Sequence, residues 1–89
     1  MPEQRKKGEE DYSFRINPNP ANETATLEIT SIDEERTIYL INYMGKIVKM
    51  YVLGANEGQK NMDISELPSG LYYIKIEGQD QNKKLIKIN

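Results

Sequence analysis

The plainest pattern in this chain is the alternation of side-chain types in Leu71-Tyr72-Tyr73-Ile74-Lys75-Ile76-Glu77. Successive side chains of an extended chain point to opposite faces, so every second residue from Tyr72 shares one face. That face is apolar and suited to burial. Pro68 and Gly70 precede the stretch and Gly78 follows it, and these residue types are typical of turns. The stretch predicts a β-strand with Tyr72 in the core and Tyr73 on the opposite face.

Six further stretches alternate in the same way or are rich in β-branched and aromatic residues. They are residues 12–16, 24–30, 37–43, 47–53, 59–64 and 83–88. Both 37–43 and 47–53 carry apolar residues on both faces, so some of their Tyr and Ile side chains are expected at the surface. In 83–88, Ile86 and Ile88 alternate with Lys83 and Lys87. Seven short strands separated by turns predict an all-β fold, a seven-stranded antiparallel immunoglobulin-like Greek-key β-sandwich.

Length and composition limit the number of domains and the classes of function that this chain can have. With 89 residues the chain allows one domain. Residues 1–11 are almost entirely polar and predict a flexible linker or tail, whereas residues 12–89 form the folded domain. The chain has no cysteine and no histidine, so disulfides, thiolate metal sites and histidine-based catalysis are excluded. We therefore expect no enzyme and no cofactor.

The charge and hydropathy of the chain exclude two further classes. The net charge is −2 and no large basic run is present, so nucleic-acid binding is not expected. No apolar run approaches the ~20 residues that a transmembrane helix needs. We therefore expect no nucleic-acid partner and no transmembrane segment.

Three stretches and the last strand occur together in one known family. They are Ile16–Ala21, Ile38–Val48, Met62–Ile76 and the lysine-rich Lys83–Ile88. In this order and spacing they resemble the type A C-terminal sorting domain of the type IX (Por) secretion system of Bacteroidetes, over residues 14–89. The family often has an aspartate near the turn of the second stretch. Asn42 and Tyr43 stand there in this chain, and asparagine also suits such a turn.

The resemblance implies a non-catalytic secretion signal joined to an N-terminal cargo domain of a parent protein. Its partners would be the outer-membrane type IX translocon, which recognises the folded domain, and a sortase-like peptidase, which cleaves it from the cargo. The cargo would pass through the periplasm and outer membrane and end at the cell surface or secreted. We expect cleavage in the polar stretch before the first strand, at Gly8, Glu9, Glu10 or Asp11.

The same stretches supply the candidates for contact with the translocon. They are Asn17, Pro18, Pro20, Gly70, Tyr72, Tyr73, Lys83, Lys84 and Lys87. Structural alternatives exist for most of them. The proline turn can simply end a strand, because proline lacks a backbone donor. Gly70 can supply a φ that other residues disfavour, Tyr72 can belong to the core, and lysines can guard an edge strand.

Two other functions fit the same fold. A binding or adhesion module would show a row of exposed aromatics, for which Tyr39, Tyr43, Tyr51 and Tyr73 are available. A spacer domain of a surface protein would lie between other domains. Unguarded strand edges and an apolar outer face also favour a homodimer.

Overall fold

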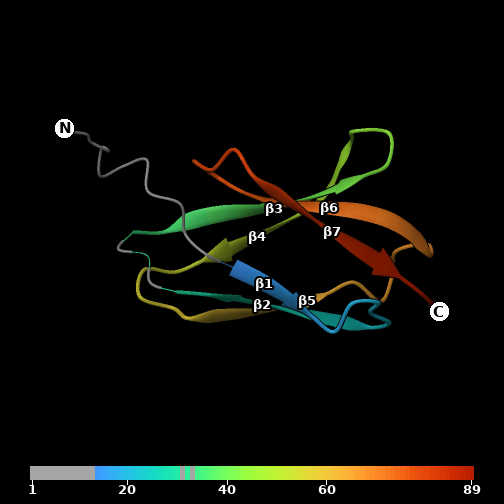
Figure 1. Ribbon diagram of the computed structural model, residues 1–89, viewed down its shortest axis with the longest axis horizontal. Helices are drawn as coiled ribbons and strands as arrows, with labels where there is room; N and C mark the ends of the chain where they lie inside the picture. Colours follow the sequence, from blue (N-terminus) through green and yellow to red (C-terminus); the bar gives the residue numbers. More distant parts are fainter. Residues whose placement is uncertain (1–13, 31, 33) are drawn as a thin grey trace.

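The computed structural model describes residues 14–30, 32 and 34–89, and these form two β-sheets packed face to face (Figure 1). The strands are β1 (Phe14–Asn17), β2 (Thr24–Ile29), β3 (Arg36–Asn42), β4 (Ile47–Leu53), β5 (Gln59–Asp63), β6 (Gly70–Ile76) and β7 (Asn82–Lys87). One sheet has the order β1-β2-β5 and the other β4-β3-β6-β7. All neighbouring strands are antiparallel. The predicted all-β immunoglobulin-like Greek-key sandwich is confirmed.

The predicted strand positions agree closely with the observed ones. Six of the seven stretches match a strand to within one residue at each end. The first stretch was expected from residue 12, and residues 12 and 13 lie outside the described part of the chain. The agreement follows from the sandwich itself, because each strand has one covered face and so shows a period of two.

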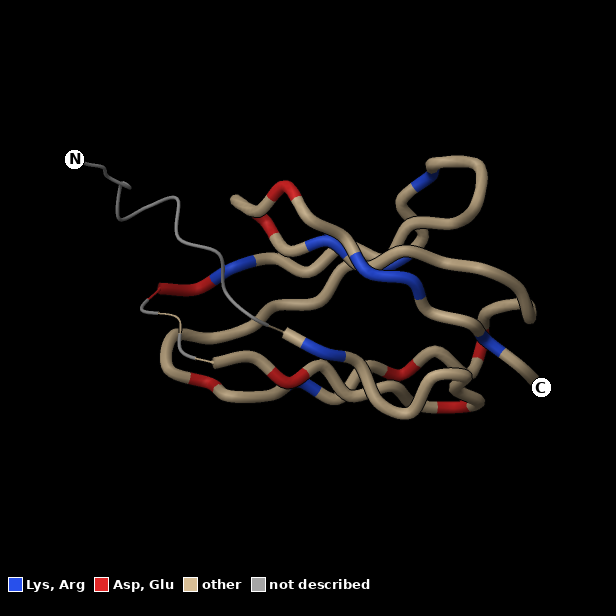
Figure 2. Tube along the Cα trace, in the orientation of Figure 1, with Lys and Arg blue, Asp and Glu red and all other residues tan. Residues whose placement is uncertain are grey.

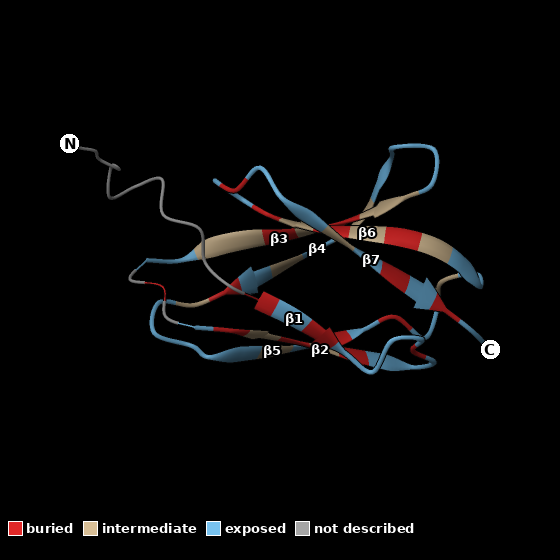
Figure 3. Ribbon diagram, viewed as in Figure 1, coloured by how far each residue is buried: buried red, intermediate tan, exposed pale blue. Residues whose placement is uncertain are grey.

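The core lies between the sheets and is built from the inward side of every strand (Figure 3). In β6, Ile74 and Ile76 are fully buried and Tyr72 is 5% exposed, whereas Leu71 and Tyr73 are partly exposed on the other face. The predicted placement of Tyr72 and Tyr73 is therefore confirmed. Several apolar residues of β4 are exposed, as the two-faced pattern of that strand predicted: Ile47, Met50 and Val52.

The terminal strand β7 differs from the expectation drawn from its lysines. Leu85 and Lys87 face inward, with Lys87 only 2% exposed, whereas Ile86 and Ile88 are exposed. Pairing with β6 decides this, because Leu85 stands opposite the buried Tyr72. Of the alternatives for Lys87, the guarding of an exposed edge does not fit this burial. The Lys87 Nζ instead lies 3.1 Å from the side-chain oxygen of Asn89 and 3.3 Å from the Ile88 carbonyl.

The outward side of the four-stranded sheet, which we call the outer face, combines apolar and basic side chains. The strands of this sheet contain, over their described residues, six basic residues and no acidic one (Figure 2). Only Lys75 and Lys84 point to the outer face; the register turns Arg36, Lys49, Lys83 and Lys87 to the other side. Tyr73 and Lys84 are direct cross-strand partners here, and Leu71 pairs with Ile86 beside them.

Candidate functional site

The two ends of the sandwich carry different parts of the sequence (Figure 1). The chain enters β1 at one end, where the loops after β2, β4 and β6 also lie. The opposite end, which we call the motif end, carries the turns after β1, β3 and β5 together with the chain end at Asn89. A strand of seven residues is about 23 Å long, so the two ends are separated by about this distance. All three sequence stretches of the resemblance thus meet at the motif end.

The Asn17–Pro20 turn does more than end a strand. The Asn19 side-chain amide donates to the Lys84 carbonyl at 2.9 Å, and its oxygen accepts from the Ile86 N–H at 3.0 Å. Ala21 continues this pairing, because its N–H donates to Ile86 and its carbonyl accepts from Ile88. We call Asn19 and Ala21 the edge clamp. It covers the outer backbone edge of β7, so a partner strand has no free edge to pair with from Lys84 to Ile88.

Asn17, Pro18 and Pro20 have exposed side chains around this clamp. Both X-Pro bonds of the turn, Asn17-Pro18 and Asn19-Pro20, are cis. The turn thus presents its prolines to solvent while Asn19 and Ala21 face β7. Sequence reasoning selected the prolines and missed Asn19, although asparagine between two prolines in a turn is a residue whose amide can replace a missing backbone partner.

The Pro68–Tyr72 segment forms a second part of the motif end. Gly70 has a φ of +152°, which side chains with a Cβ rarely adopt, so its predicted conformational role is confirmed. The Tyr72 hydroxyl donates to the Pro68 carbonyl at 2.6 Å and ties the turn to the core. Burial raises the pKa of this hydroxyl. Tyr72 therefore supports the turn from within and does not present its ring to a partner.

The turn between β3 and β4 completes the motif end. Asn42 Oδ1 accepts from the N–H groups of Met44 and Lys46 at 2.9 and 3.0 Å, so asparagine organises this turn. Tyr43, at 72% exposed, projects beside it. A groove of about 220 Å³ lies between this turn and the segment before β6, lined by Asn42, Tyr43, Val48 and residues 67–72. Apolar side chains can be received there.

The candidate lysines of β7 are separated by the fold. Lys84 is exposed beside Tyr73 on the outer face, whereas Lys83 turns inward with its Nζ 5.4 Å from the centre of the Phe14 ring. Lys87 is buried, as described above. Of the candidates, Asn17, Pro18, Pro20, Gly70 and Lys84 are exposed and Tyr73 is partly exposed, whereas Tyr72 and Lys87 are buried.

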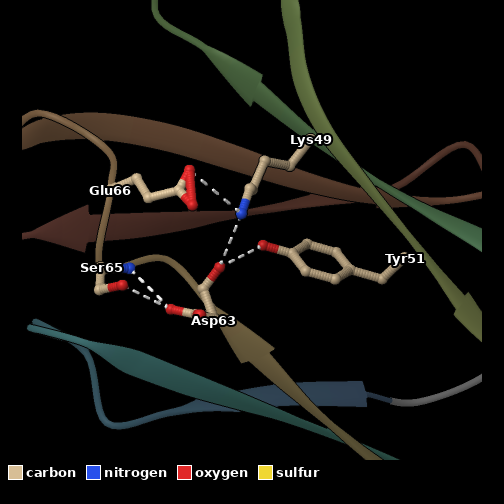
Figure 4. Close-up of polar contacts among 5 residues, drawn as sticks. All are labelled: Lys49, Tyr51, Asp63, Ser65 and Glu66. Carbon is tan, nitrogen blue, oxygen red and sulfur yellow. Dashed lines mark hydrogen bonds and ion pairs between the residues drawn. The ribbon is translucent and has the colours of Figure 1, made fainter.

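A polar link that the sequence did not indicate joins the two sheets (Figure 4). The Asp63 carbonyl of β5 accepts from the Tyr51 hydroxyl at 2.9 Å and from Lys49 Nζ at 3.3 Å, both from β4. We call these three residues the sheet latch. The Lys49 Nζ also lies 3.9 Å from a Glu66 carboxylate oxygen. Tyr51, expected among the exposed aromatics of a binding module, is half-buried and engaged in this link.

Two ionisable groups in the latch have shifted pKa values. Burial, followed by the negative charges of Asp63 and Glu66, raises the pKa of Tyr51 to about 12. Hydrogen bonds from the Ser65 N–H and hydroxyl to the Asp63 carboxylate lower the pKa of Asp63. A raised tyrosine pKa and a lowered aspartate pKa fit a structural link, because neither shift makes its side chain a better nucleophile.

Replacing Tyr51 with phenylalanine tests the latch. Below pH 10 the Tyr51 hydroxyl is protonated in both the folded and the unfolded chain. Above pH 10 it ionises first in the unfolded chain, so the free energy of unfolding falls until about pH 12. We expect Tyr51→Phe to cost about 1 kcal/mol at neutral pH, for the lost hydrogen bond. Between pH 8 and pH 11.5 the variant should also lose about 1 kcal/mol less stability than the wild type. This value is reduced because solvent screens a half-buried group. Urea unfolding at pH 8 and pH 11.5 checks both, and parallel pH profiles would contradict the assignment.

The described residues form neither a metal-binding cluster nor a membrane-spanning helix. Among them, no three acidic side chains gather in a way that could hold a metal ion. No helix in that part of the chain is long and apolar enough to cross a membrane. The expected cleavage residues Gly8, Glu9, Glu10 and Asp11 lie outside the described residues.

Comparisons with known proteins agree with this arrangement. The family model described as "Secretion system C-terminal sorting domain" matches residues 15–89. Karilysin from Tannerella forsythia is 28% identical over 85 residues, which cover 83% of this chain and 18% of that protein. The crystal structure of dimeric latent PorU from Porphyromonas gingivalis superimposes with a TM-score of 0.69 at 16% identity, covering 86% of this chain and 9% of that one. This chain therefore spans less than a fifth of either relative.

Proposed function

This chain belongs to the family of type IX secretion system C-terminal sorting domains, which mark proteins for export to the cell surface or for secretion, and we propose that its motif end is the part that the export machinery recognises. The cargo would precede residue 14, so the motif end is the end of the sandwich farthest from it. The outer-membrane translocon could then contact this end while a folded cargo follows behind. Convergence of the family's stretches at that one end is the observation that carries the proposal.

Side chains, and not a free strand, would be recognised in this contact. The edge clamp already occupies the outer backbone edge of β7, which leaves the prolines of the turn, Tyr43 and Lys84 as exposed groups and Tyr73 as a partly exposed one. The groove beside Tyr43 would receive an apolar side chain of the translocon. Gly70, Tyr72 and Lys87 would act indirectly, by shaping the surface above them.

Removal of the domain is the second part of the proposal. A sortase-like peptidase would cleave between Gly8 and Asp11, in the polar stretch that precedes the sandwich. Mass spectrometry of the exported cargo tests this, since the cargo should end within these four residues. A cargo that ends inside the sandwich, after Phe14, would be inconsistent with it.

The position of the motif end predicts where an added tag blocks export. Residues 12–89 fused to a periplasmic reporter should bring it to the surface of a type IX-competent cell. A short Gly-Ser tag after Asn89 would lie on the motif end and should leave the reporter in the periplasm. The same tag inserted at Asn56, in the exposed loop at the opposite end, is the matched control and should permit export. Surface labelling of the reporter measures both.

This pair of tags also separates the rival functions. A binding module or a spacer domain would leave the untagged fusion in the periplasm, whereas export of both tagged forms would show that a free chain end is not recognised. Retention of both forms, with the untagged fusion exported, would place the recognised surface elsewhere on the sandwich. Retention of the untagged fusion itself would contradict the secretion role.

A further inference from the structure

Sheet edges are sites where a further strand can add, and three of the four edges in this sandwich are protected. The β7 edge is covered by the edge clamp from Lys84 to Ile88. The β5 strand is short and carries Gln59, Lys60, Asn61 and Asp63 among its five residues, and the carbonyl at its end is occupied by the sheet latch. The β1 strand has four residues and ends before Pro18, which has no N–H to donate.

The β4 edge lacks each of these protections. It spans seven residues, contains no proline, and has no strand beyond it in the described part of the chain. Its single charged residue, Lys49, is turned toward Asp63 and Glu66 and does not guard the edge. Met50 and Val52 are 64% and 52% exposed. Such a strand is long, apolar and open to pairing.

The hydrogen-bond register shows which backbone groups are free for this. Asn42 N–H bonds the Lys46 carbonyl, and Glu77 N–H bonds the Thr37 carbonyl. Even-numbered residues of β3 therefore face β4, and odd-numbered ones face β6. Tyr51 and Leu53 stand opposite Ile38 and Arg36 and so bond to β3. The N–H and carbonyl groups of Met50 and Val52, in between, point away from the sheet.

We propose that two copies of this chain associate by antiparallel pairing of their β4 edges, which joins the two four-stranded sheets into one eight-stranded sheet. The edge is suited to itself, because a two-fold axis near Met50 brings β-branched, aromatic and methionine side chains together and opposes no unpaired charges. This pairing goes beyond the secretion role and does not depend on it.

Charge favours this edge pairing over stacking of two outer faces. The outer face carries Lys75, partly exposed on β6, and Lys84, exposed on β7, and stacked sheets are about 10 Å apart, so stacking would place these like charges within a Debye length. In the edge-paired sheet, β6 and its copy are five strand spacings apart, or about 24 Å. Their repulsion is then largely screened at physiological salt.

Sedimentation from micromolar to millimolar concentration tests the pairing. The 89-residue chain should pass from 10.3 kDa to twice that mass as its concentration rises. Met50→Pro should abolish the dimer, because proline removes an edge-facing N–H and leaves the bonds to β3 intact. Val52→Lys, which adds a guard charge to the edge, should do the same. The matched control Ile86→Lys adds the same charge on β7 of the outer face and should leave the dimer intact.

Amide exchange gives a direct readout at the edge. The Met50 and Val52 N–H groups should become protected as concentration rises, whereas Tyr51 N–H is protected throughout. A chain that stays at 10.3 kDa at millimolar concentration overturns the proposal. It is also overturned by a dimer that survives both edge variants or dissociates in Ile86→Lys. If Met50→Pro fails to fold, as circular dichroism would report, Val52→Lys and amide exchange still decide.

Discussion

Replacing Ile74 with alanine is expected to lower the free energy of unfolding by about 2–5 kcal/mol and to leave a reporter fusion in the periplasm. Ile74 is fully buried, stands opposite Leu40 in the centre of the four-stranded sheet, and would leave a cavity that its rigid neighbours cannot fill. A domain of this size has a total stability of about 5–10 kcal/mol, so this change removes a large part of it. Urea unfolding and surface labelling measure the two effects.

The matched control is Ile86→Ala on the neighbouring strand. It removes the same atoms from a side chain that is 43% exposed, and the change in stability should stay within about 0.5 kcal/mol. Export of the Ile86→Ala fusion, with retention of Ile74→Ala, is the result expected of a signal that is recognised in folded form. If the strongly destabilised Ile74→Ala fusion were exported as well as the wild type, recognition of the unfolded sequence would be favoured instead.

Asn19→Ala should destabilise the domain by about 1–2 kcal/mol, because two hydrogen bonds to the β7 edge are lost at an exposed site. For a chain of this length that corresponds to a fall in melting temperature of about 5–15 °C. Asn19→Asp keeps an acceptor for the Ile86 N–H but loses the donor to the Lys84 carbonyl, so its effect should be intermediate. Faster amide exchange at Ile86 would locate the change on β7.

Asn22→Ala, in the same loop, is the control for this substitution. Asn22 is exposed and takes no part in the clamp, so its replacement should change the melting temperature little. If Asn19→Ala and Asn22→Ala changed the melting temperature equally, the effect would belong to the loop as a whole. The clamp assignment would then be wrong. Export of the Asn19→Ala fusion should fall in proportion to the loss of ordered β7.

Much of the fold is predictable from local patterns. Alternation, together with β-branched and aromatic composition, placed six of the seven strands to within one residue, and alternation assigned Tyr72 to the core and Tyr73 to the outside. The conformation of Gly70 could be predicted from its residue type alone, because its positive φ is a property of its own backbone. The division between a polar tail of residues 1–11 and the domain stays a prediction, because it lies outside the described residues.

The candidate surface was predictable in part. The order of the stretches identified the family, and the matching family model over residues 15–89 confirms it. The contacts within the site were not predictable, because they join residues distant in sequence. Asn19 reaches Lys84 and Ile86 across more than sixty positions, and Tyr51 reaches Asp63 from the other sheet.

The amino-acid sequence by itself determined that this chain is a small β-sandwich of the sorting-domain family without histidine or cysteine chemistry, because alternation and residue type act locally along the chain. The tertiary structure alone decided that Lys87 is buried, that β7 is clamped and that the β4 edge stays open. The physical reason is that burial and hydrogen bonding at an edge depend on which strand lies next to it. Strand order is set by packing of the whole domain.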